Sequence, residues 1–199
     1  MKKAFILSMV LGTALLYSLA LAHGAHEHGV AKMNIAIEGA KVEIALESPL
    51  VNAISFEHAP TTDAQRAEVR AMAAKLRKPE EIFLLTKAAQ CRPVEVSLAS
   101  ENLPPELLGE TAAATESDRH DPDVKADDKA MTGAHDEHDG HGDLDASFTF
   151  ACARPEALKS LDVQLFKIWP ALHEVEVQLV TPSGQKGAEL TSKKHTLAW

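Results

Sequence analysis

The chain has 199 residues, with 20 Lys plus Arg against 29 Asp plus Glu, a formal net charge of -9, and 10 His. An excess of carboxylates without clustered Lys and Arg argues against nucleic-acid binding and favours cations as small partners. With 45% hydrophobic but only 5% aromatic residues, the chain predicts a mainly aliphatic core in one domain, or at most two small ones.

Residues 1–22 have the three parts of a secretory signal. Lys2 and Lys3 form a positive start, residues 4–16 are apolar, and residues 20–22 are a cleavage site of the A-x-A kind. The alternative is a permanent membrane anchor, although the run is short for a spanning helix. Cleavage after Ala22 removes two lysines and no acids, so the net charge changes from -9 to -11. We therefore expect a periplasmic protein that begins at His23.

The first half of the mature chain predicts a hairpin followed by a helix. Apolar residues alternate over 33–37 and 42–46, on either side of a turn at 38–40. Thr62 and Gln65 have the spacing of a capping box, and a helical stripe then leads to Pro79. The stripe consists of Val69, Met72, Ala73 and Leu76. A second short helix is expected to begin within residues 80–86, and a strand over 94–98.

An acidic segment then interrupts the domain. Residues 116–145 contain 11 acids, 3 basic residues and 4 His, with few large apolar side chains. Such a segment cannot bury enough surface to offset its ordering entropy, so we expect a mobile His/Asp-rich loop.

Regular structure resumes after this loop. Phe148, Phe150 and Cys152 alternate as in a strand, and Pro155 is placed to begin a helix whose apolar stripe reaches Pro170. A strand over 175–179 leads into a turn at 181–184, and a last strand is expected within 195–199. Together these elements predict an α+β fold in one domain over residues 23–199. It consists of an antiparallel sheet or sandwich with short helices.

The two cysteines, Cys91 and Cys152, are the only ones and form no C-x-x-C motif. In an oxidising compartment they predict a disulfide. It would close a loop of about 60 residues, for which the chain-entropy model gives roughly 4 kcal/mol. Two free, buried thiols are the alternative.

Six of the ten histidines fall in two short clusters, His23, His26 and His28 at the mature N-terminus and His135, His138 and His141 in the acidic loop. Imidazole is a preferred ligand of zinc, copper and nickel, and short spacings allow several ligands to reach one ion. We predict metal binding at both clusters. The alternative is a solvated polar tail and loop.

His58 is a further candidate ligand, and Glu57 beside it is expected to act in the second shell by orienting an imidazole. Packing or surface exposure is the alternative for such an isolated histidine, and more so for His120, His173 and His195. Ligand type alone does not select the metal, so zinc is expected while copper and nickel remain alternatives. Affinity should fall below about pH 6, where imidazoles protonate.

Taken together, these residues resemble the family of zinc-regulated periplasmic proteins typified by ZrgA. The resemblance rests on residues 23–29, the Phe56-Glu57-His58 step, Cys91, the His/Asp loop and Phe148-x-Phe150-x-Cys152. It implies a periplasmic zinc-binding protein associated with a zinc uptake system, with His26, His28, His58 and the loop histidines as ligands.

The leading hypothesis is therefore a protein that captures zinc and supports its uptake or delivery to a membrane importer. A copper- or nickel-binding or metal-buffering protein is the first alternative. An envelope interaction protein with a merely solvating acidic loop is the second. An enzyme is not expected, because neither H-E-x-x-H nor a nucleophile motif occurs.

Overall fold

The computed structural model describes residues 27–110 and 142–199. The strands are β1 (Val30–Glu38), β2 (Lys41–Pro49), β3 (Phe83–Leu85), β4 (Cys91–Ala99), β5 (Asp143–Cys152), β6 (Ser160–Val163), β7 (Glu174–Thr181), β8 (Gly184–Thr191) and β9 (Thr196–Ala198). The α-helices are α1 (Asp63–Leu76), α2 (Pro79–Ile82), α3 (Pro105–Leu108) and α4 (Leu165–Ile168). Three short 3-10 helices are η1 (Leu50–Asn52), η2 (Lys87–Ala89) and η3 (Pro155–Ala157). The predicted signal segment, residues 1–22, lies outside the described residues.

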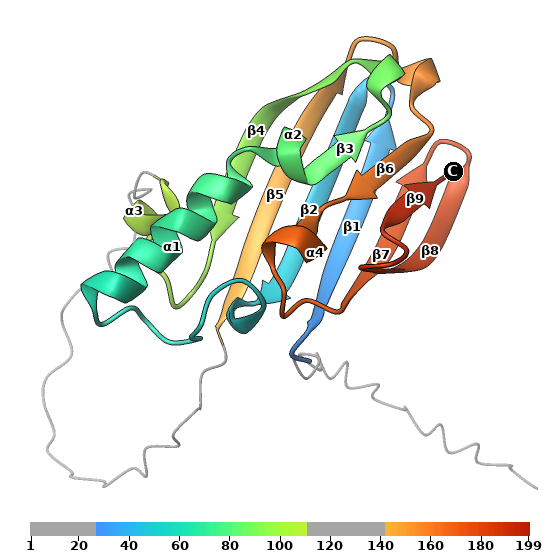
Figure 1. Ribbon diagram of the computed structural model, residues 1–199. Helices are drawn as coiled ribbons and strands as arrows, with labels where there is room; N and C mark the ends of the chain where they lie inside the picture. Colours follow the sequence, from blue (N-terminus) through green and yellow to red (C-terminus); the bar gives the residue numbers. More distant parts are fainter. Residues whose placement is uncertain (1–26, 111–141) are drawn as a thin grey trace, which may run out of the picture.

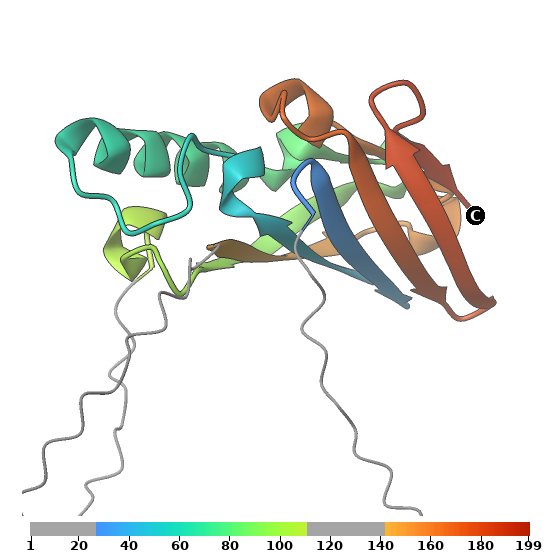
Figure 2. The same cartoon turned by 90° about the horizontal axis from the view of Figure 1, so that it is seen from below.

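The strands form two sheets, a six-stranded sheet in the order β4-β5-β2-β1-β7-β8 and a three-stranded sheet in the order β3-β6-β9 (Figure 1). Among the described strands, β1 and β7 pair in parallel and the other pairs are antiparallel. Helices α1 and α4 and the small sheet lie on one face of the large sheet (Figure 2). This arrangement confirms the predicted α+β class.

The first hairpin follows the predicted alternation. Ile35 lies opposite Ile44 and Met33 opposite Leu46, and all four side chains are at most 2% exposed. The residues between them face the other side of the sheet, where Glu43 is exposed. Period-2 patterning therefore correctly identified the two strands and their buried face.

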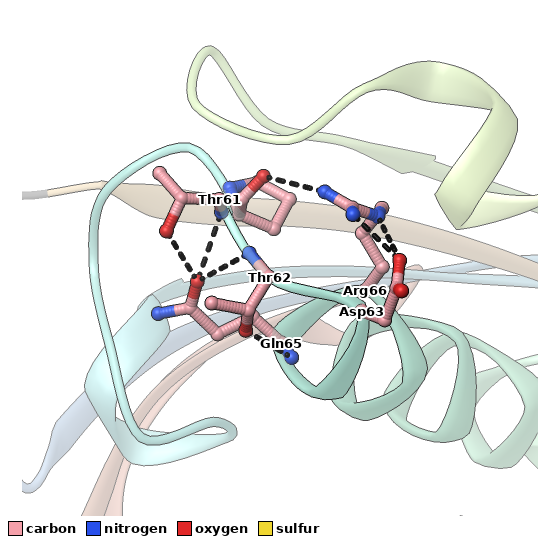
Figure 3. A network of polar contacts seen from close by, with 6 residues as sticks. Thr61, Thr62, Asp63, Gln65 and Arg66 are labelled. Carbon is pink, nitrogen blue, oxygen red and sulfur yellow. Dashed lines mark hydrogen bonds and ion pairs between the residues drawn. The ribbon is translucent and has the colours of Figure 1, made fainter.

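Helix α1 begins with the predicted capping box (Figure 3). Gln65 N–H donates to the Thr62 hydroxyl at 3.2 Å, and Thr62 N–H donates to Gln65 Oε1 at 3.2 Å. Arg66 pairs with Asp63 at 2.6 Å in the same first turn. The buried residues are those of the predicted stripe, Val69, Met72, Ala73 and Leu76. The helix ends at Leu76, and Pro79 begins the next helix, α2.

The predicted helix from Pro155 to Pro170 is wrong. The segment folds as η3, strand β6 and the four-residue helix α4. Leu161 and Val163 are both buried while Asp162 between them is partly exposed, which is the alternation of a strand. The leucine spacing matched a helical stripe by coincidence, and pairing of β6 with both β3 and β9 determines the structure.

Three other segments differ from the sequence analysis. The helix expected within 80–86 is α2, which stops at Ile82, and the next residues form β3. In β4, Val94 is 57% exposed because the strand bulges between Pro93 and Glu95. Strand β8 was not predicted, since its sequence alternates weakly.

The C-terminal boundary of the predicted acidic loop also needs correction. Residues 143–145 begin strand β5, where Leu144 is fully buried. The remainder of that prediction, residues 116–141, lies outside the described residues.

The predicted disulfide is confirmed. Cys91 and Cys152 are bonded, lie opposite each other on β4 and β5, and are 61 residues apart in the chain. The bond therefore encloses the whole stretch that separates the two described parts. In those two parts, no helix combines the length and apolar character needed to span a bilayer.

Replacing both cysteines with alanine should destabilise the protein. Losing the constraint on a loop of this length lowers the free energy of unfolding by about 2–4 kcal/mol. Urea unfolding of the C91A/C152A variant measures the loss, and reduced wild-type protein should show a similar one. An unchanged midpoint in both samples would contradict the prediction.

Candidate functional site

One end of the large sheet brings three segments of the chain together (Figure 1). Strand β1 begins there, β2 ends there, and β5 begins there opposite the end of β2. Leu50 N–H donates to the Gly142 carbonyl at 2.8 Å, which joins the turn after β2 to the start of β5. Residues 28 and 142 therefore enter the fold at the same end.

The side chain of Asn52 fixes the start of β1. Its Oδ1 accepts a hydrogen bond from Gly29 N–H at 2.7 Å. Its Nδ2 donates to the Val30 carbonyl at 2.9 Å and to the Ser48 hydroxyl at 3.1 Å. Asn52 is 2% exposed and Ser48 is fully buried, so these bonds are made away from water. They hold the backbone next to His28 in one position.

Position 29 requires glycine because of its backbone conformation and because His173 lies close to it. Its φ is 86°, in the region that favours glycine. A Cβ atom at this position would lie 2.6 Å from Cδ2 of His173. The Gly29 carbonyl also accepts hydrogen bonds from the backbone N–H groups of His173 and Glu174, at 2.7 and 3.0 Å.

Glu57 is held on the loop that follows η1. Asn102 Nδ2 donates to the Glu57 carbonyl at 2.7 Å, although the two residues are 45 apart in the chain. A Cβ atom at Gly142 would lie 2.4 Å from that carbonyl and 2.6 Å from Asn102 Nδ2. Glycine at 142 therefore allows β5, Glu57 and Asn102 to approach closely.

The structure brings His28 and Glu57 together. The distance from His28 Nε2 to Glu57 Oε1 is 3.3 Å. The imidazole is 56% exposed, whereas the carboxylate side chain is only 16% exposed. An accessible imidazole nitrogen thus lies beside a largely buried carboxylate oxygen.

His58 is placed differently from His28. Its Nδ1 is 2.8 Å from the Ala59 carbonyl, and its ring packs against Phe56 with centroids 5.2 Å apart. Among the described residues, Glu57 forms an ion pair with His28 and not with His58. His58 is exposed on the same loop as Glu57.

The remaining predicted ligands, His23, His26, His135, His138 and His141, lie outside the described residues. Within residues 27–110 and 142–199, no three His, Cys, Asp or Glu side chains gather closely enough to hold a metal ion. His195 contacts Asp162 of the small sheet at 3.0 Å. The structure therefore tests the immediate setting of His28 and His58 but not the two clusters as wholes.

Acidic residues near the two ends of the stretch 111–141 have different environments. A hydrogen bond from Leu98 N–H at 2.9 Å and the Arg77 guanidinium at 2.6 Å lower the pKa of Glu110. Burial, together with repulsion by the Glu47 and Glu101 carboxylates, raises the pKa of Asp145. Glu110 is thus anchored to α1 and β4, whereas Asp145 belongs to a locally crowded group of negative charges.

Asn52, Asn102 and Gly142 were not among the site residues predicted from the sequence. Asn52 alone offered a signal, as a polar residue directly after the apolar residues Pro49, Leu50 and Val51. A buried amide in such a run must satisfy its hydrogen bonds within the protein. The partners of the other two residues are distant in the chain, so local sequence could not reveal them.

Comparison with known proteins gives a family match. The family model described as ZrgA family zinc uptake protein matches residues 25–199, which includes every described residue. No curated protein matches the chain.

Alanine at position 142 should disrupt this end of the sheet. The new Cβ would meet the Glu57 backbone, which cannot move without breaking other contacts, so we expect a loss of about 2 kcal/mol or more in the free energy of unfolding. Gly187 is the matched control, because a Cβ there meets nothing closer than 3.9 Å. Urea unfolding should show G187A close to wild type, and equal stability of the two variants would refute the argument.

Proposed function

Because the chain belongs to the ZrgA family of zinc uptake proteins, we propose that it captures Zn(II) in the periplasm and supports its delivery to a membrane importer. Both histidine clusters join the described body at one end of the large sheet. His26 is two residues before His28, and His141 directly precedes Gly142 in the chain. The observation that supports the proposal is that residues 28 and 142 enter the fold at the same end of the sheet, where His28 contacts Glu57.

The proposed ligands are the clustered imidazoles together with His58, namely His23, His26, His28, His58, His135, His138 and His141. Imidazole nitrogen suits zinc, and three such ligands are enough for a site with one exchangeable position. An exchangeable position fits a protein that releases its ion to a partner. The disulfide supports a location outside the cytoplasm, because such bonds persist in oxidising compartments.

We propose a binding role and no catalytic one. Metal-dependent hydrolysis needs a general base beside an open position on the ion. The described carboxylate next to His28 is Glu57, and its ion pair is with that imidazole.

Replacing His28 should weaken zinc binding. Isothermal titration of the mature protein should show binding near neutral pH, and H28A should raise the Kd by about 100-fold or more, since losing a direct ligand exceeds the usual effect of losing a residue that only orients one. The control is H195A, which removes another imidazole that contacts a carboxylate, in the small sheet. It should leave the Kd within about 2-fold of wild type. Absence of zinc binding by the wild type would end the proposal, as would equal effects of the two variants.

Removing residues 116–141 separates the zinc hypothesis from that of a solvating acidic loop. If the loop histidines bind metal, the deletion lowers the number of zinc ions bound per protein, measured by elemental analysis after dialysis. Competition with Cu(II) and Ni(II) in the same samples tests the alternative metals. Unchanged metal content would assign the loop a solvating role.

A further inference from the structure

The distance between His28 and Glu57 is informative about how the two groups act. A charge-assisted N–H···O hydrogen bond is normally about 2.7–2.9 Å long. The observed 3.3 Å between His28 Nε2 and Glu57 Oε1 is longer than this. Zinc binds imidazole nitrogen at about 2.0–2.1 Å and carboxylate oxygen at about 2.0–2.2 Å, so two such ligands at a tetrahedral angle lie about 3.3–3.5 Å apart. The observed spacing matches a pair of zinc ligands.

Both groups are also positioned by contacts that do not involve their own ligand atoms. Asn52 fixes the backbone at Gly29, next to His28, and Asn102 holds the Glu57 carbonyl. The largely buried carboxylate has restricted freedom, while the exposed imidazole is accessible to an arriving ion. Such preorganisation reduces the entropy lost when an ion binds.

We propose that Glu57 is itself a zinc ligand and binds the same ion as Nε2 of His28. This replaces the role predicted from the sequence, in which Glu57 only orients an imidazole. In that role His28 would bind the ion through Nδ1 and donate its Nε2–H to Glu57, and the 3.3 Å distance is long for such a bond. The proposal rests on the proposed function, because the ion is taken to be the zinc that the protein captures.

A nitrogen and oxygen pair also specifies the class of ion. Carboxylate oxygen with imidazole suits divalent ions such as Zn(II), whereas Cu(I) prefers thiolate and thioether ligands. In the described residues the only two sulfur atoms of cysteine are bonded to each other. The carboxylate and imidazole pair therefore favours a divalent cation over Cu(I).

Three variants of the mature protein test the assignment. E57Q keeps the shape of the side chain but removes the charged ligand, and E57H replaces it with an imidazole of similar reach. E27Q is the matched control, because it removes the same charge one residue from His28. Glu27 borders a separate hollow of about 100 Å³ with Lys32, Glu47 and Glu176. Thermal melting of the metal-free proteins verifies that each variant folds.

Zinc titration and zinc-edge X-ray absorption provide the two measurements. E57Q should raise the Kd by about 100-fold or more, because losing a direct ligand exceeds the usual effect of an outer-shell change. E27Q should change it less than about 3-fold. In E57H the number of imidazoles bound to zinc should rise by one relative to wild type.

Other results would overturn the assignment. Wild-type affinity in E57Q would show that Glu57 does not contact the ion. An unchanged imidazole count in E57H, with weaker binding in E57Q, would show that Glu57 only orients His28. A wild type that binds no zinc would instead refute the proposed function, so the two failures are distinguishable.

Discussion

The buried amide of Asn52 is the interaction on which this end of the molecule depends. By bonding Gly29, Val30 and Ser48, it joins the first residues of β1 to the turn that ends β2. Strand β1 lies inside the large sheet between β2 and β7, so its starting point also sets where β7 begins. An unsatisfied polar group in this position would cost about 1–3 kcal/mol. The amide therefore stabilises the sheet and positions His28 at once.

Local patterns in the sequence predicted those elements whose neighbours are close in the chain. The first hairpin and helix α1 have strong periodicity and their own turn or cap, and both were predicted with the correct buried faces. The segment after Pro155 was not, because its leucines fit both a helix and a strand. The choice is made by β3 and β9, which lie about 75 residues before and 35 residues after β6 in the chain, and such long-range pairing overrides local preference.

The candidate site also has features that local sequence can predict and features that depend on distant residues. Histidine is a candidate metal ligand by its residue type alone, so His28 and His58 could be selected as candidates from the sequence. The contact of Glu57 with His28 rather than with its neighbour His58 depends on the turn after β2, on Asn102 and on the absence of a side chain at Gly142. None of these can be inferred from spacing, because adjacent residues in a loop point in directions that tertiary contacts determine.

The disulfide makes a covalent ring of residues 91–152. The two strands that it joins, β4 and β5, are also paired along most of their length. A single break of the backbone anywhere between Cys91 and Cys152 would leave two polypeptides that remain bonded to each other. A protein cleaved once within this ring would still migrate as one species on a non-reducing denaturing gel and separate into two fragments only after reduction. The long stretch between β4 and β5 can thus be cut without releasing either half of the domain.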